Sequence, residues 1–108
     1  MKRRGSLSID EKIALITGGS RGIGRAIAFR LARAGIKVAV NYKSNDIAAK
    51  SVVKAVEDLG GSAMAIIGDV SQSKDVEAMV KSVVDAWGRI DILVNNAGII
   101  HDSLLMRM

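Results

Sequence analysis

The sequence predicts an α/β fold in which a doubly wound parallel sheet lies between two layers of helices. Short apolar runs alternate with amphipathic segments from residue 12 onward, in the order β-α-β-α-β-α-β. The apolar runs do not alternate with polar residues, which is typical of parallel strands that are covered on both faces. Right-handed crossover connections between such strands then predict a three-layer αβα arrangement with the strand order 3-2-1-4.

Four strands are expected, and each is short, apolar and bounded by turn or loop signals. The loops that join strands to helices are short, as they are in most α/β units. The expected strands are Lys12–Thr17, Lys37–Asn41, Ala63–Ile67 and Asp91–Asn95.

Three helices are expected between these strands: Gly22–Ala34, Asp46–Leu59 and Ser73–Trp87. Glycine follows each one and predicts its end, and Asn45 is suited to cap the second helix. In the first helix Ile23, Ile27 and Leu31 recur at i, i+4 and i+8, so we expect them on the buried face. The corresponding face of the third helix comprises Val76, Met79, Val80 and Val83.

A glycine-rich turn, Thr17-Gly18-Gly19-Ser20-Arg21-Gly22-Ile23-Gly24, joins the first strand to the first helix. Glycine lets the backbone approach a ligand closely, and a helix N-terminus offers free N–H groups and partial positive charge. The turn therefore predicts a phosphate site. It departs from the P-loop pattern, because Arg25 and Ala26 stand where a lysine and a hydroxyl residue are needed. It also departs from G-x-G-x-x-G, because Ile27 stands where the third glycine is due.

The ligand is expected in the crevice at the carboxyl ends of the strands, beside the point where the strand order reverses. Four segments fall at those ends and should converge on one site. They are residues 18–24, 41–44, 69–70 and 95–98.

Length and composition fit one domain with one core, formed by residues 12–108 after an N-terminal tail of residues 1–11. No apolar run approaches the roughly 18 residues that a membrane span needs. The basic start, Met1 to Arg4, is not followed by the apolar stretch of a signal peptide. The chain has no cysteine for a disulfide or a thiolate metal site. A cytoplasmic protein with no membrane partner and no metal is expected.

The formal net charge of +5 is unevenly distributed. Residues 1–54 hold 12 Lys and Arg against 3 Asp and Glu, whereas residues 55–108 hold 4 against 8. A positive field on the side that receives phosphates would explain this asymmetry, although a solvated helix face with a basic tail would also do so. The three aromatic residues do not interleave with the basic ones, so no nucleic-acid partner is expected.

The spacing T-G-x-x-x-G-x-G, with Thr17, Gly18, Gly22 and Gly24 in place, resembles the cofactor loop of the short-chain dehydrogenase/reductase family. Asn95-Asn96-Ala97-Gly98 at the end of the fourth strand is typical of that family, and so is Asp69-Val70 after the third. Residues 102–108 are similar to the corresponding segment of 3-oxoacyl-[acyl-carrier-protein] reductases. The resemblance covers nearly the whole chain from Lys12 and implies the N-terminal, Rossmann-type cofactor-binding half of such an enzyme.

The resemblance also implies roles for individual residues. Asp69 and Val70 would contact the adenine ring. Asn95, Asn96 and Ala97 would line the nicotinamide-ribose side, although Asn95 and Asn96 could instead only satisfy backbone groups between strands. The residues placed around the pyrophosphate and its neighbouring ribose are Gly18, Ser20, Gly22, Ile23 and Gly24.

The charge at the end of the second strand favours NADP(H) over NAD(H). An NAD site usually has an Asp or Glu there to bind the ribose 2′-OH, but this chain has Asn41, with no carboxylate before Asp46. Arg21 and Lys43 would supply donors to a 2′-phosphate, which a carboxylate would repel.

The family's chemistry requires a Tyr-x-x-x-Lys pair together with a Ser and an Asn, and none of these can be assigned here. The single tyrosine, Tyr42, has Asp46 four residues later in place of lysine. We therefore expect a dinucleotide-binding half of an NADPH-dependent 3-oxoacyl reductase, inactive alone and prone to self-association through the apolar edge at Ile92-Leu93-Val94. The full-length form would be a homo-oligomer that reduces a 3-oxoacyl substrate linked to acyl carrier protein, or a similar carbonyl compound. The alternative is a stand-alone or inactive dinucleotide-binding module that associates with another chain.

Overall fold

The computed structural model describes residues 12–20 and 22–96. They form β1 (Ile13–Thr17), α1 (Gly22–Arg33), β2 (Lys37–Tyr42), α2 (Asp46–Asp58), β3 (Ala63–Ile67), α3 (Ser73–Trp87) and β4 (Ile92–Asn95). The strands make one parallel sheet in the order β3-β2-β1-β4. The predicted fold class and strand order are confirmed, and no element boundary differs from the expected one by more than one residue.

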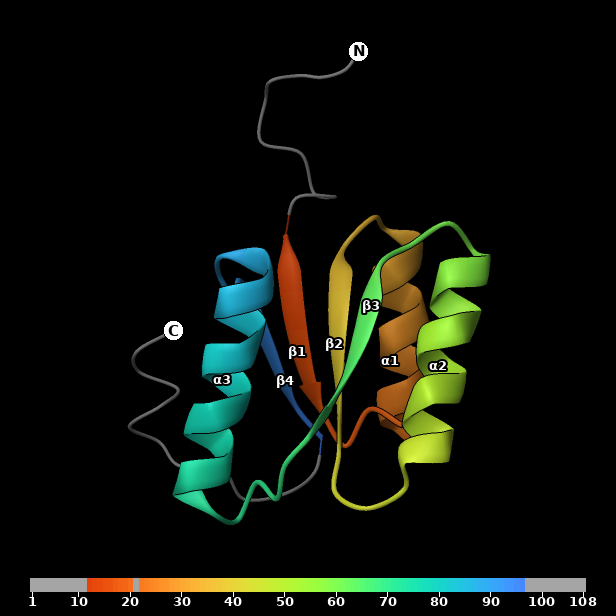
Figure 1. Cartoon of the computed structure of the whole chain (residues 1–108). Helices are drawn as coiled ribbons and strands as arrows, with labels where there is room; N and C mark the ends of the chain where they lie inside the picture. The colour runs from red at the N-terminus through yellow and green to blue at the C-terminus, as the bar shows by residue number, and fades with distance from the viewer. Residues whose placement is uncertain (1–11, 21, 97–108) are drawn as a thin grey trace.

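The sheet separates two helical layers, with α3 on one face and α1 and α2 on the other (Figure 1). Successive β1 side chains alternate between these layers. Leu15 belongs to the apolar cluster that includes Val76, Met79 and Val83 of α3. Ile16 belongs to the cluster that includes Val52 of α2 and residues of α1. Each layer therefore has its own apolar core on its side of the sheet.

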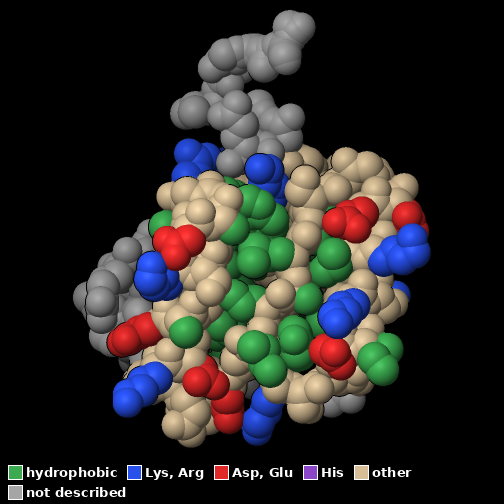
Figure 2. All heavy atoms as spheres, viewed as in Figure 1, with side chains coloured by type: hydrophobic (Ala, Val, Ile, Leu, Met, Phe, Trp, Pro, Cys, Tyr) green, Lys and Arg blue, Asp and Glu red, His purple; other side chains and the backbone are tan. Residues whose placement is uncertain are grey.

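The two inner strands are far more buried than the two outer ones. All five residues of β1 are buried, whereas most of β3 and all of β4 are half-buried or exposed. Figure 2 shows apolar side chains gathered in the strip between α3 and α2, where β3 lies in Figure 1. The apolar residue at the end of β3, Ile67, is 63% exposed.

The expected buried face of α1 is confirmed in part: Ile27 and Leu31 are half-buried and pack against the core, but Ile23 does not. Gly24, Ala28 and Ala32 are the buried residues of this helix, whereas Ile23 is 71% exposed. The most buried residues have the expected spacing of i, i+4 and i+8, but each lies one residue after the predicted one. The reason is the close approach of α1 to the glycine turn. A Cβ atom on Gly24 would lie 2.3 Å from the Gly18 carbonyl oxygen and 2.8 Å from Asn96 Nδ2, so only the small-residue stripe fits there.

The expected helix ends are confirmed. The Asn45 side chain accepts a hydrogen bond of 3.1 Å from the Ala48 N–H and caps α2. Gly88 ends α3 in the left-handed conformation, with its N–H on the Val84 carbonyl oxygen at 2.7 Å. Across residues 12–20 and 22–96, no helix has the length and apolar character needed to cross a membrane.

Candidate functional site

The carboxyl ends of the strands meet at one edge of the sheet, the lower edge in Figure 1, and a hollow of about 340 Å³ opens there. Residues from the end of β2 and from the loops after β1, β2 and β3 line it. They are Gly18, Asn41, Lys43, Gly68, Asp69, Val70 and Ser71. Five of these seven were predicted site residues, so the structure brings three of the four predicted segments together around one hollow.

The glycine turn is closed on one side and open on the other. Gly24 packs against the protein, as described above, whereas a Cβ on Gly22 would meet nothing within 4 Å. Gly22 also has a positive φ of 63°, which favours glycine. The first N–H groups of α1, which begins at Gly22, have no acceptor within the helix. The start of α1 therefore presents backbone donors that the helix itself does not satisfy, beside the open space at Gly22.

The fourth segment braces this turn. The Asn96 side chain donates to the Gly18 carbonyl oxygen at 3.2 Å, and the Asn96 N–H donates to Thr17 Oγ1 at 2.9 Å. The Thr17 hydroxyl lies 3.2 Å from Asn95 Oδ1 and 3.3 Å from the Val94 carbonyl oxygen. The described contacts of Asn95 and Asn96 thus match the second role considered for them, in which they satisfy groups between the strands. Direct contact of these residues with a dinucleotide stays a prediction.

Asn41 faces inward, with only 2% of its surface exposed. Its amide nitrogen donates to the Gly68 carbonyl oxygen at 3.0 Å and to that of Ile66 at 3.3 Å. Its Oδ1 accepts the Gly18 N–H at 3.1 Å. Because both ends of this amide are engaged with protein atoms, its expected contact with a 2′-phosphate finds no support in the geometry and stays a prediction.

A charged pair lies at the mouth of the hollow. Lys43 Nζ is 3.6 Å from Asp69 Oδ2, and the lysine side chain is 75% exposed. Ser71 donates from its hydroxyl at 2.7 Å and from its N–H at 2.9 Å to Asp69 Oδ1. These Ser71 hydrogen bonds, with the Lys43 charge, lower the pKa of Asp69 below its ordinary value. Asp69 is therefore a carboxylate at neutral pH, and its charge is partly offset by Lys43.

Two further predicted site residues lie deeper. Ser20 is only 8% exposed, and its hydroxyl has no hydrogen-bond partner among the described residues. Val70 is also 8% exposed and packs in the α3-side core beneath the hollow. Arg21 and Ala97 lie outside the described residues.

Ser71 and Gly68 also line the hollow but were not predicted from the sequence. The pattern Asp69-x-Ser71 is typical of a carboxylate that receives hydrogen bonds from the residue two positions later, and it could have identified Ser71. Gly68 packs closely against the Met79 side chain, since a Cβ there would lie 2.6 Å from Met79 Sδ. No local signal in the sequence indicates that contact.

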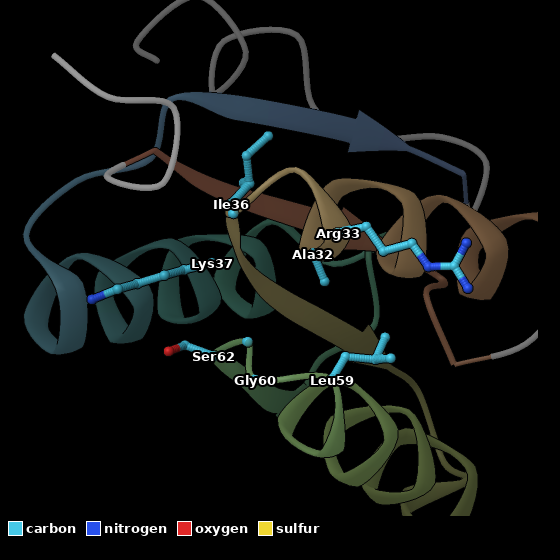
Figure 3. A pocket seen from close by; sticks show the side chains of 9 residues that line it. Ala32, Arg33, Ile36, Lys37, Leu59, Gly60 and Ser62 are labelled. Atoms are coloured by element: carbon cyan, nitrogen blue, oxygen red, sulfur yellow. The ribbon is translucent and has the colours of Figure 1, made fainter.

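A second hollow, of about 440 Å³, lies at the opposite edge of the sheet, near the ends of α1 and α2 (Figure 3). Its two cationic side chains, Arg33 and Lys37, point in opposite directions. Lys37 Nζ lies 5.7 Å from the centre of the Trp87 ring instead. This hollow contains no converging set of donors, and it is remote from the glycine turn.

Comparison with known proteins gives consistent results. A protein-family model described as short chain dehydrogenase matches residues 12–108. A 3-oxoacyl-[acyl-carrier-protein] reductase of Synechocystis sp. is 46% identical over 101 residues, which cover 94% of this chain and 41% of that protein. A reductase of the same name from Staphylococcus aureus (strain Mu50) is 50% identical over 97 residues, which cover 90% of this chain and 39% of that one.

Solved structures agree with the sequence relatives. A dehydrogenase/reductase from Sinorhizobium meliloti 1021 superposes with a TM-score of 0.80 at 47% identity, covering 89% of this chain and 37% of that one. A short-chain dehydrogenase/reductase from Serratia marcescens gives 0.78 at 43% identity, covering 82% and 36%. This chain spans about two fifths of the length of the curated relatives it matches. The chain belongs to the short-chain dehydrogenase family.

Proposed function

We propose that this chain supplies the NADP(H)-binding part of a reductase that acts on a 3-oxoacyl group carried by acyl carrier protein. The family and the names of the relatives support an oxidoreductase. The observation that carries the cofactor part is the crevice lined by Gly18 of the glycine turn, by the end of β2 and by the loops after β2 and β3. The same resemblance supports a cytoplasmic enzyme whose full-length form is a homo-oligomer.

The described residues fit a dinucleotide pyrophosphate. The first N–H groups of α1, from Gly22 onward, are unpaired within the helix and carry the partial positive charge of its N-terminus. The buried Ser20 hydroxyl beside them has no described partner and suits a phosphate oxygen. Gly22 leaves space where a side chain would otherwise stand. These groups would hold the diphosphate against the turn.

The preference for NADP(H) rests on charge. Lys43 extends into solvent at the mouth of the hollow, and Asp69 is the one described carboxylate in its lining. Asp69 accepts two hydrogen bonds from Ser71 at Oδ1 and pairs with Lys43 through Oδ2 at 3.6 Å, so its charge is already partly offset within the site. Lys43, together with Arg21, would offer charge-assisted hydrogen bonds to a 2′-phosphate.

In such a reductase the bound nicotinamide supplies a hydride to the substrate carbonyl carbon. The residues of this chain bind and orient that cofactor. The proton for the carbonyl oxygen comes from a group that we do not assign to this chain, since its single tyrosine, Tyr42, lacks a lysine four residues later. Binding, without turnover, is the activity proposed for the chain itself.

Calorimetric titration with NADPH and NADH at fixed salt tests the proposal. We expect tighter binding of NADPH, and we expect Arg21→Glu to reduce or reverse that preference. Loss of one charge-assisted contact costs about 1.5–3 kcal/mol. Arg30→Glu makes the same charge change in the last turn of α1, far along the helix from the glycine turn, and should leave the preference in place. Equal affinities for the two cofactors in the unaltered chain would contradict the NADP(H) assignment.

A further inference from the structure

Asn41 lies between the two loops that form the walls of the hollow. It is next to last in β2, whose neighbours in the sheet are β1 and β3, and it is almost completely buried. The glycine turn follows β1, and the segment 68–71 follows β3. A side chain at this position can contact both loops at once.

Asn41 holds the glycine turn through two acceptors. Its side-chain Oδ1 accepts the Gly18 N–H at 3.1 Å. Its main-chain carbonyl oxygen accepts the Gly19 N–H, also at 3.1 Å. The N–H groups of Gly18 and Gly19 are therefore directed into the protein, and the donors that remain for a phosphate are those that follow them.

The same side chain holds the loop after β3 through its donors. The two N–H groups of the amide are shared among four acceptors, of which the Gly68 carbonyl oxygen, at 3.0 Å, is the nearest oxygen. Met79 Sδ lies 2.9 Å from Nδ2 and fills the space beneath Gly68. The Gly68 N–H in turn donates to the Tyr42 carbonyl oxygen at 2.9 Å.

We propose that Asn41 is a positioning residue that sets the distance between the glycine turn and the segment 68–71 and thereby shapes the dinucleotide site. The inference rests on the proposed function, since it concerns the affinity of that site. An amide is suited to the position because it has an acceptor for Gly18 and donors for Gly68 on the same carbon. Aspartate keeps the acceptor but lacks the donors, and alanine lacks both. The residue thus acts through the loops and not by touching the cofactor.

The first test compares NADPH affinity in Asn41→Ala, Asn41→Asp and the control Val52→Ala. Val52 is fully buried in the other apolar cluster, on α2, and its truncation should reduce stability without moving either loop. We expect both Asn41 variants to bind NADPH roughly tenfold or more weakly at temperatures where they are folded, and Val52→Ala to bind within about twofold of the unaltered chain. Unchanged affinity in a folded Asn41 variant would overturn the positioning role and leave the proposed function intact. No binding by the unaltered chain would overturn the proposed function itself.

A second measurement needs no variant and remains decisive if the Asn41 variants do not fold. Amide hydrogen exchange of the unaltered chain should show Gly18 protected without any dinucleotide, because its N–H is already bonded to Asn41. Gly22 should exchange fast when free and slow on addition of NADPH. A Gly18 amide that exchanges as fast as Gly22, and becomes protected only with NADPH, would overturn the inference.

Discussion

The backbone N–H of Ile13 donates a 2.8 Å hydrogen bond to Asp91 Oδ2, and the Asp91 N–H donates one of 2.8 Å to the Ile13 carbonyl oxygen. This pair ties the start of β1 to the residue that precedes β4. Arg89 Nε also lies 2.9 Å from the same carboxylate oxygen. Burial alone would raise the pKa of Asp91, but the Ile13 hydrogen bond and the Arg89 contacts outweigh it and lower the pKa below its ordinary value.

The lowered pKa of Asp91 predicts a specific loss of stability in acid. A carboxyl group whose pKa is lower in the folded state stabilises the fold above its unfolded pKa, about 3.9, and this contribution is lost as pH falls through the folded pKa. Asp91→Asn should therefore show a smaller decrease in unfolding free energy below about pH 4 than the unaltered chain does. Urea unfolding at a series of pH values measures this.

The matched control is Asp85→Asn, which removes an exposed carboxylate from the i, i+4 pair with Lys81 on α3. Its acid profile should follow that of the unaltered chain, because exposed helix pairs contribute little. Identical profiles for Asp91→Asn and the unaltered chain would contradict the account of this contact.

Gly24→Ala should destabilise the chain, although alanine is normally the better helix former. The new Cβ would lie 2.3 Å from the Gly18 carbonyl oxygen, which is backbone and cannot move without displacing the turn. We expect a loss of about 1–3 kcal/mol, in contrast to the usual gain of about 0.5–1 kcal/mol. Ser82→Ala, at an exposed position of α3, is the control and should be neutral or slightly stabilising. A stabilised Gly24→Ala variant would show that the turn is not packed as described.

The chain alone should show no reductase activity toward acetoacetyl-type substrates with NADPH. Its single tyrosine, Tyr42, has Asp46 where the family's Tyr-x-x-x-Lys pair needs a lysine. The assay follows NADPH oxidation by chain whose intact mass has been verified. Steady oxidation above background would refute this prediction.

The isolated chain should self-associate. Both outer strands of the described sheet have apolar residues in half-buried or exposed positions, with Ile92, Leu93 and Val94 on β4 and Ile67 on β3. Unpaired strand edges of this kind favour pairing with another chain. We expect light scattering and thermal unfolding to depend on protein concentration. A monodisperse monomer with a sharp, concentration-independent transition would favour a module that folds alone.

The order of the elements, their ends and the edge that carries the site could be predicted because they depend on local signals. Three signals extend over only a few residues: the spacing of apolar residues, the glycine after each helix and the Asn45 cap. The strand order follows from the handedness of the crossover connections. The convergence of the loops followed from the same topology.

The remaining features depend on how closely segments approach one another in space. The face of α1 is decided by contact of Gly24 with Gly18, so the small residues are buried and Ile23 is not. The inward direction of Asn41 depends on acceptors in β3, in the loop after it and in α3, and the Asp91 bond joins residues 78 positions apart. Hydrophobic periodicity does not indicate these contacts, and the glycine motif marks Gly18 and Gly24 without showing that they meet.

The central claim is that a dinucleotide binds at the carboxyl edge of the sheet, between the glycine turn and the segment 68–71. Backbone amide chemical shifts recorded during titration with NADPH test it most directly. The account predicts the largest changes at Ser20, Gly22, Ile23, Val70 and Ser71. Gly60, Gly61 and Ser62, which line the hollow at the opposite edge, should remain unchanged. Changes confined to those three residues, or no changes at saturating NADPH, would contradict it.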